Sequence, residues 1–187
     1  MVGPDRTADR DPGPGGIVYR EAVADDAAPL AEFARATFVA TFGHLYPPAD
    51  LAGFLAGKYG ADRQRAEIEE RANRLLLALE HGAIVGYCLS GELRLPVEGP
   101  GLELQRLYVA EHVRGRGVAA ALIEDAIAWA RSRGAPALYL SVWENNERAQ
   151  RFYRRYGFEH VGEHGFMVGS VRDRDLIWRL DLARLSG

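Results

Sequence analysis

The stretch Arg114-Gly115-Arg116-Gly117-Val118-Ala119 combines residues that could bind an anion. It follows a predicted strand and opens a long apolar helix, whose first N–H groups have no intrahelical partner and lie at the positive end of the helix dipole. The two glycines let the backbone approach a ligand closely, and the two arginines add positive charge. This arrangement suits a pyrophosphate. A glycine-rich turn with solvated arginines would explain the same residues.

A dinucleotide-binding turn is one alternative for this stretch. The third glycine of that fingerprint is replaced by Ala120, but Glu144 follows the next predicted strand, where the fingerprint needs an acidic residue. Spacing alone therefore leaves a Rossmann-type oxidoreductase as an open alternative.

The elements that position this turn follow from the periodicity of the apolar residues and from glycine and proline breaks. Predicted strands cover 17–19, 74–80, 83–91, 102–109, 137–143, 158–161, 165–168 and 176–182. A first predicted helix begins near Asp25 and is broken at 43–48. Further predicted helices cover 50–59, 62–72, 117–133 and 145–156. This order predicts a single-domain α/β (α+β) fold with a central mixed, mainly antiparallel sheet flanked by helices.

The first residues differ in composition from the rest. Residues 1–16 contain three prolines and four glycines and almost no large apolar side chain. Such a segment buries too little surface to offset its ordering entropy, so we predict a disordered leader over 1–16 and a folded domain over 17–187.

Composition removes several classes of function. The 187 residues carry a net charge of −3 and the sequence pI is about 6.0, which disfavours a nucleic-acid partner. The single cysteine, Cys88, excludes an intramolecular disulfide. Apolar runs are too short to span a membrane, and no signal-peptide core is present, so we expect a cytoplasmic location without a membrane partner. No residue cluster has metal-ligand spacing, so we expect no metal.

Two motifs, taken together, resemble those of the GNAT superfamily of N-acetyltransferases. Arg114-x-x-Gly117-x-Ala119 resembles its (Q/R)xxGx(G/A) acyl-CoA motif, and Asn146-x-x-Ala149-x-x-x-Tyr153-x-x-x-Gly157-Phe158 resembles its second cofactor motif. The resemblance covers roughly 17–182. Further stretches resemble the bacterial spermidine/spermine acetyltransferase (PaiA-like) subgroup, namely Leu138–Glu144, His164-x-Phe166-x-Val168-Gly169, Asp175-Leu176-Ile177, Thr37-Phe38 and Thr41-Phe42.

The resemblance implies that acetyl-CoA is the co-substrate and that an amine attacks its thioester directly, without an acyl-enzyme on Cys88. Pantetheine would lie along Leu107-Tyr108-Val109, with the Val109 N–H facing the carbonyl oxygen, and the pyrophosphate on the 114–119 turn. Tyr153 would be the general acid that protonates the leaving thiolate. Asn146 and Ala149 would contact the cofactor. Asn146 could also cap the following helix, alone or together with the cofactor role.

The acceptor side is assigned by resemblance as well. Glu103, which points away from the face shared by its neighbours Leu102 and Leu104, would accept the amine proton, hold a water that does, or bind the substrate. A solvated strand carboxylate would explain the same residue. Gln105 stands where the subgroup often has a second acid. The positions that match the cleft-lining or flanking residues of the subgroup, and that could equally be ordinary strand residues, are Trp143, Glu144, His164 and Phe166.

The resulting hypothesis is an acetyl-CoA-dependent N-acetyltransferase acting on the primary amine of a small molecule, with a polyamine such as spermidine or spermine favoured. Alternatives are an acetyltransferase for an amino acid, a peptide N-terminus or an amine antibiotic, and a non-catalytic acyl-CoA-binding sensor. By analogy with relatives, the protein would be a monomer or homodimer.

Overall fold

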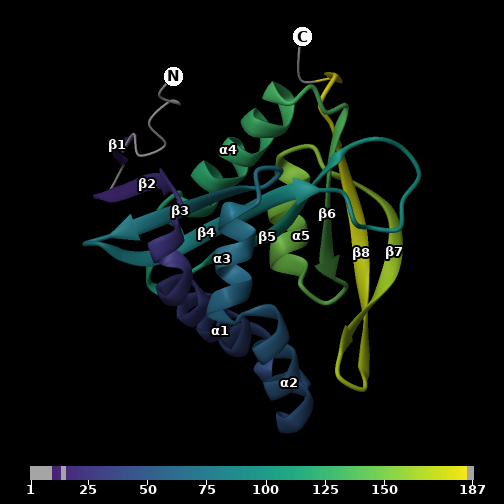
Figure 1. Ribbon diagram of the computed structural model, residues 1–187. Helices are drawn as coiled ribbons and strands as arrows, with labels where there is room; N and C mark the ends of the chain where they lie inside the picture. Colours follow the sequence, from purple (N-terminus) through teal and green to yellow (C-terminus); the bar gives the residue numbers. More distant parts are fainter. Residues whose placement is uncertain (1–9, 14–15, 185–187) are drawn as a thin grey trace.

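The strands join into one sheet in the order β1-β2-β3-β4-β5-β6-β8-β7 (Figure 1). The computed structural model describes residues 10–13 and 16–184. Its strands are β1 (Arg10–Gly13), β2 (Ile17–Glu21), β3 (Arg74–Glu80), β4 (Ala83–Glu92), β5 (Leu102–Val109), β6 (Ala137–Trp143), β7 (Glu159–Val168) and β8 (Val171–Asp181). Its α-helices are α1 (Ala27–Phe42), α2 (Pro48–Lys58), α3 (Ala61–Glu69), α4 (Val118–Ser132) and α5 (Glu147–Arg155).

Neighbouring strands run antiparallel everywhere except at β5 and β6, which are parallel. This confirms the predicted mixed, mainly antiparallel sheet flanked by helices. It also removes the dinucleotide-binding alternative, because a doubly wound Rossmann sheet is mostly parallel.

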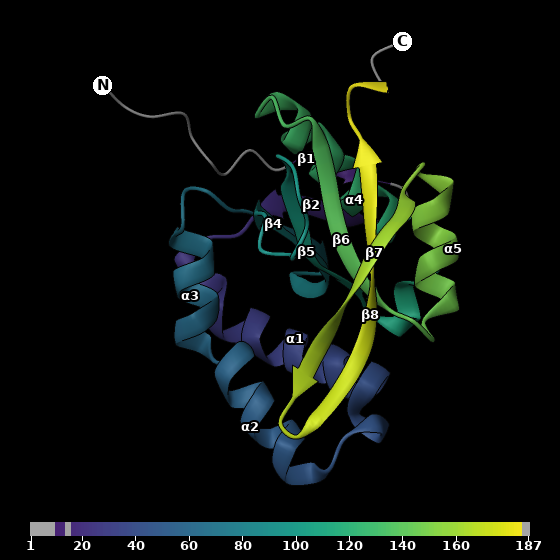
Figure 2. The same cartoon turned by 90° about the vertical axis from the view of Figure 1, so that its right-hand side faces the viewer.

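Helices cover both faces of the sheet and bury a separate apolar cluster on each. The first cluster joins α4 and α5 to one face and includes Leu122, Leu140 and Phe158. The second cluster joins α1, α2 and α3 to the other face and includes Phe38 and Leu77. Figure 2 shows α5 and the group α1–α3 on opposite sides of β6, β7 and β8. Among the described helices, none is both long and apolar enough to cross a membrane.

Two predicted turns are confirmed by backbone conformations that need glycine. Gly117 has φ 84° at the N-cap of α4, which places the helix start directly after the β5 turn. Gly134 has φ 70°, and its N–H donates to the carbonyl of Arg131 at 2.9 Å, so the helix ends where the sequence predicts. The anion-binding geometry expected of the 114–119 turn is therefore available.

Two segments differ from the sequence-based prediction. Residues 10–13 fall in the predicted disordered leader but form β1, paired with β2; pairing needs only backbone groups of an open edge strand, not large apolar side chains. The rest of that leader, 1–9 and 14–15, lies outside the described residues, apart from Gly16. The two short strands predicted at 158–161 and 165–168 are one strand, β7, and β8 begins at Val171 rather than at Leu176.

The central feature of the sheet is that β5 and β6 separate. They pair only at Leu102 with Leu138 and at Glu103 with Tyr139, although both strands continue well beyond these positions. A register shift between Leu89 and Ser90 leaves Gln105 as an extra residue in β5, and such bulges bend a strand away from its neighbour. The gap that results lies in the middle of the sheet.

Candidate active site

A cavity of about 350 Å³ lies at the gap between β5 and β6. Residues of both diverging strands line it, together with side chains from α1, α2, α5, β7 and β8. Segments far apart in the sequence therefore meet at the point where the sheet opens.

In the part of β5 beyond its short pairing with β6, main-chain N–H and C=O groups face this gap. In an antiparallel pair, residues that bond to the partner strand alternate with residues whose N–H and C=O point away. The Ala110 N–H donates to the Val85 carbonyl at 2.8 Å, so the residues that point away from β4 are Leu107 and Val109. Their N–H and C=O groups face the gap, where β6 no longer pairs. The predicted N–H of Val109 is therefore directed to the open side.

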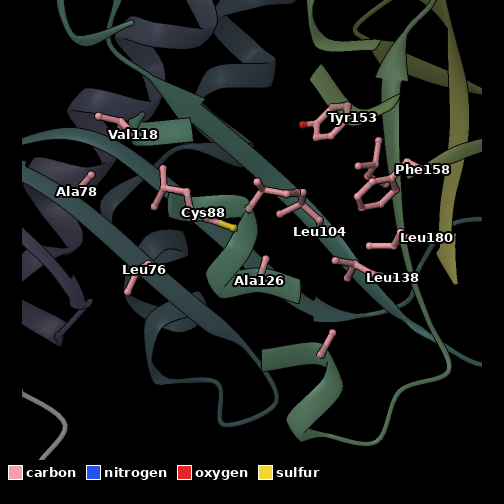
Figure 3. Close-up of a cluster of buried hydrophobic side chains, with 14 of the residues drawn as sticks. Leu76, Ala78, Cys88, Leu104, Val118, Ala126, Leu138, Tyr153, Phe158 and Leu180 are labelled. Carbon is pink, nitrogen blue, oxygen red and sulfur yellow. The ribbon is translucent and has the colours of Figure 1, made fainter. Parts of the chain in front are cut away.

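Tyr153 on α5 lies at the same gap. Its side chain lines the cavity, and the residue is 9% exposed. Figure 3 shows its ring at the edge of the first apolar cluster, with the hydroxyl pointing away from Phe158. The ring packs edge-on against Phe152 and Phe158 at centroid distances of 5.4 and 5.7 Å. Burial raises the pKa of the Tyr153 hydroxyl, so it keeps its proton at neutral pH.

Asn146 and Ala149, the other predicted cofactor contacts on this side, also line the cavity. The side-chain oxygen of Asn146 accepts the Ala149 N–H at 3.2 Å, so Asn146 is the N-cap of α5. The capping alternative is confirmed, and it fixes the start of the helix that carries Tyr153.

The glycine turn before α4 leaves its backbone accessible to a ligand. Gly115 has φ 82°, and a Cβ placed at Gly115 or Gly117 would meet nothing within 4 Å, so the space above the turn is open. Val118 packs into the apolar cluster. The Arg116 guanidinium lies 2.8 Å from Glu80, and that of Arg114 lies 3.5 Å from Glu111. The N–H groups of the helix start are therefore the main feature open to an anion.

Glu103 lines the cavity, whereas its neighbours Leu102 and Leu104 pack in the first apolar cluster, which confirms its predicted direction. Its Oε2 accepts two backbone N–H groups, from Arg94 at 2.8 Å and from Leu95 at 3.2 Å. Burial raises the pKa of the Glu103 carboxyl. The side chain thus fixes the loop before β5 while facing the cavity.

Two carboxylates on β8 line the cavity and were given no role in the sequence analysis. Asp173 accepts the hydroxyl hydrogen of Tyr46, and Asp175 lies 3.3 Å from the Ser141 hydroxyl of β6. Burial raises the pKa of Asp175 to about 6, with a smaller contribution from Asp173. The alternating acids Asp173 and Asp175 were the available signal, but the predicted strand began just after them.

The raised pKa of Asp175 makes stability depend on pH in a defined direction. Because its folded-state pKa of about 6 exceeds the ordinary 3.8, the native chain binds more protons than the unfolded chain between these values. The contribution to the free energy of unfolding is present below about pH 4 and is lost as the pH rises through 6. Asp175→Asn should therefore gain stability over wild type on going from pH 4 to pH 7, on the order of 2 kcal/mol. Urea unfolding of both proteins at the two pH values measures this; an equal difference at both would contradict it.

Several aromatic side chains line the cavity. Trp143 packs edge-on against Phe42 at 6.1 Å, and Phe166 packs against Phe54 at 5.6 Å. His164 also lines the cavity. Its Nε2 has no hydrogen-bond partner among the described residues, and burial lowers its pKa. Of the predicted acceptor residues, these three lie together at the site.

Glu144 is the predicted acceptor residue that the structure places elsewhere. It is not among the residues that line the cavity, and its carboxylate lies 3.1 Å from the Arg174 guanidinium. The neighbouring Arg174 also pairs with Glu163, so Glu144 belongs to a surface network.

Arg106 on β5 and Lys58 at the end of α2 bring positive charge to the cavity, and neither was singled out from the sequence. The Arg106 guanidinium makes two contacts with Glu67, at 2.7 and 2.9 Å, and lies 5.1 Å from the centre of the Tyr59 ring. This bidentate pair is almost fully removed from solvent.

Cys88 lies on β4 in the first apolar cluster and does not line the cavity. Burial raises the pKa of its thiol to about 12, so thiolate is essentially absent at neutral pH. This agrees with the prediction that Cys88 is a core residue and not a nucleophile.

The comparisons with known proteins agree with this geometry. The profile of the acetyltransferase (GNAT) family matches residues 35–158. An uncharacterized N-acetyltransferase of Lactobacillus delbrueckii subsp. lactis is 32% identical over 154 residues, which cover 79% of this chain and 89% of that protein. A Bacillus subtilis subsp. natto protein named probable spermine N(1)-acetyltransferase is 29% identical over 99 residues, 51% of this chain and 65% of that one. The crystal structure of the PaiA N-acetyltransferase from Thermoplasma acidophilum in complex with coenzyme A shares the fold, with a TM-score of 0.72 at 20% identity over 88% of this chain and 98% of that chain.

Proposed function

Because the chain belongs to the GNAT family of acetyltransferases, we propose that it transfers the acetyl group of acetyl-CoA directly to a primary amine bound in this cavity. The separation of β5 and β6 is the observation that carries the proposal. It brings the open main-chain groups of Leu107 and Val109, the hydroxyl of Tyr153 and the carboxylates of β8 to one gap.

The residues present fit acetyl-CoA. The β5 main chain offers Leu107 and Val109 to the amides of a pantetheine arm, as an added strand would be held. The helix start after Gly117 offers N–H groups to the pyrophosphate, where Gly115 leaves open space for its approach. When bound, acetyl-CoA supplies an activated acetyl group as a thioester.

Tyr153 is proposed as the general acid. The amine nitrogen forms a bond to the carbonyl carbon, the carbon–sulfur bond breaks, and the sulfur takes the proton of the Tyr153 hydroxyl. The phenol beside the gap keeps its proton at neutral pH, so that proton is available for this step. The Val109 N–H would stabilise the charge that develops on the carbonyl oxygen.

Glu103 is proposed as the group that receives the proton lost by the amine, through a water. Its Oε2 already accepts two N–H groups, so a relayed transfer fits better than direct contact. Burial raises its pKa, which makes it a better proton acceptor than an ordinary carboxylate. Asp173 and Asp175 would bind the ammonium form of the acceptor before transfer, because they are carboxylates in the same cavity.

The acceptor class has two candidates. A polyamine is supported by the carboxylates of β8, the aromatic residues Trp143 and Phe166, and the partial similarity to a protein named as a spermine acetyltransferase. An amine that also carries an anionic group is favoured by the positive charge of Lys58 and Arg94, which also line the cavity.

The test is release of the CoA thiol from acetyl-CoA across polyamines, diamines, amino acids, short peptides and aminoglycosides. We expect saturable, amine-dependent release with at least one of them, and acetyl-CoA should raise the melting temperature of the protein. Thermal stabilisation by acetyl-CoA without release on any amine would contradict catalysis and favour a non-catalytic acyl-CoA-binding module.

A further inference from the structure

One wall of the cavity carries four cationic side chains, each from a different element or loop. They are Lys58 at the end of α2, Arg63 on α3, Arg94 in the loop before β5 and Arg106 on β5. Glu67 is shared by two of them, because it lies 2.8 Å from Arg63 as well as in contact with Arg106. The positive charge of this wall therefore exceeds what the buried carboxylate neutralises.

Lys58 and Arg94 keep the excess charge. Within the residues that the structure describes, no carboxylate oxygen lies within 4.0 Å of the charged nitrogens of Lys58 or Arg94. Arg94 does interact electrostatically with Glu103 at longer range. Burial lowers the pKa of Lys58, and repulsion from Arg106, Arg63 and Arg94 lowers it further, against a smaller opposite effect of Glu67. Charges of one sign held together at a cavity are stabilised when an anion binds among them.

Among the acidic side chains that line the cavity, Glu103 belongs to β5 and accepts the N–H groups of Arg94 and Leu95, whereas the other two come from β8. Asp173 and Asp175 belong to β8, which pairs with β6 on the far side of the gap from β5. Tyr46 and Ser141 hold these two carboxylates in place through the contacts described above. The cavity thus has one side on α2, α3 and β5, whose cationic groups outnumber the carboxylates of Glu67 and Glu103, and an acidic side on β8.

We propose that the natural acceptor is an amino acid or short peptide, whose primary amine lies at the β8 carboxylates and whose free carboxylate is bound by Lys58 and Arg94. The inference rests on the proposed acetyl transfer and names its substrate class. Transfer leaves the carboxylate unchanged, since only the amine nitrogen forms a new bond.

A linear polyamine fits this arrangement less well. With one ammonium at Asp173 and Asp175, its further ammonium groups would extend toward Lys58 and Arg94 and be repelled. A carboxylate at the same place gains charge-assisted hydrogen bonds instead. The structure therefore favours an acceptor with both signs of charge over the polyamine favoured by the sequence.

The first experiment compares matched acceptors. Linear ω-amino acids, α-amino acids and dipeptides are assayed for CoA-thiol release beside diamines of the same chain length and beside the carboxamides of the same amino acids. We expect kcat/KM for the best amino acid or peptide to exceed that for its carboxamide by about tenfold, the value of one charge-assisted contact. The corresponding diamine should be poorer still.

The second experiment locates the effect at the cationic wall. Lys58→Gln should raise KM for the carboxylate acceptor by about tenfold and KM for its carboxamide far less, whereas Lys58→Arg keeps the preference. Calorimetric binding of the carboxylate acceptor to the protein with CoA should weaken in parallel, independently of turnover.

The outcomes separate the two proposals. Turnover that is faster on diamines or polyamines than on matched amino acids would overturn the inference and leave acetyl transfer intact. If Lys58→Gln raised KM equally for the carboxylate acceptor and for its carboxamide, the inference would also be overturned, because a merely structural role of Lys58 predicts that pattern. Absence of turnover on every amine would contradict the proposed function itself.

Discussion

Replacement of Tyr153 by phenylalanine is expected to lower kcat by about 10²–10³-fold, the usual contribution of a positioned general acid. The change removes the proton that the leaving sulfur needs and keeps the ring that packs against Phe152 and Phe158. KM for acetyl-CoA and the melting temperature should therefore stay close to the wild-type values. Steady-state kinetics at saturating amine, with a thermal unfolding curve of each protein, measures both effects.

The matched control is Tyr156→Phe, three residues along the same helix. The Tyr156 hydroxyl donates to Glu124 at 3.2 Å, and Tyr156 does not line the cavity. We expect kcat of this variant within about twofold of wild type, as for a surface substitution away from the site. An unchanged kcat for Tyr153→Phe would remove Tyr153 as the acid.

Glu67→Gln is expected to have the largest effect on stability. The substitution leaves the buried Arg106 guanidinium without its carboxylate, and breaking one partner of a buried pair typically costs about 3–5 kcal/mol. At the lower end of that range, a chain of this length should lose about 6–12 °C in melting temperature. Urea unfolding gives the free energy directly.

Glu69→Gln on the same helix provides the comparison. Glu69 lies 3.9 Å from Arg65, and both side chains are exposed. Its loss should change the free energy of unfolding by less than about 0.5 kcal/mol. Equal and small effects of the two variants would show that the Arg106–Glu67 pair does not contribute as its burial implies.

The cofactor side of the site could be predicted from the sequence because its determinants are local. The turn 114–119 is a continuous stretch at a helix start, and Asn146, Ala149 and Tyr153 recur on one short helix. Spacing within one element carries such information, and the structure brings the three α5 residues to the cavity beside Leu107.

The acceptor side could not be predicted to the same extent because it depends on contacts between distant segments. Lys58, Arg94 and Arg106 reach one wall only after α2, a loop and β5 have packed together. Asp173 and Asp175 became part of the site because β8 extends further than its apolar residues predicted. Glu144 faces Arg174 for the same reason, since the cross-strand partner supplied by β8 is not visible in the local sequence.

The position of Gln105 illustrates a backbone irregularity that the sequence does not predict. Gln105 lines the cavity together with Glu103, as alternation predicts, but a bulge makes it an extra residue in β5, and its amide donates to the Glu92 carbonyl at 3.2 Å. Bulges arise from pairing with the neighbouring strand, so the alternation of one strand alone does not predict them.

The most direct test of the account follows the acetyl group itself. The protein is incubated with acetyl-CoA labelled in the acetyl carbons and with the best acceptor of the amine panel, and the products are analysed by mass spectrometry. Direct transfer should give labelled N-acetyl acceptor and free CoA in equal amounts, with no label on the protein, and intersecting initial-velocity lines when both substrates are varied. Label retained on the protein, or binding of acetyl-CoA without any labelled acceptor, would contradict direct transfer in the cavity between β5 and β6.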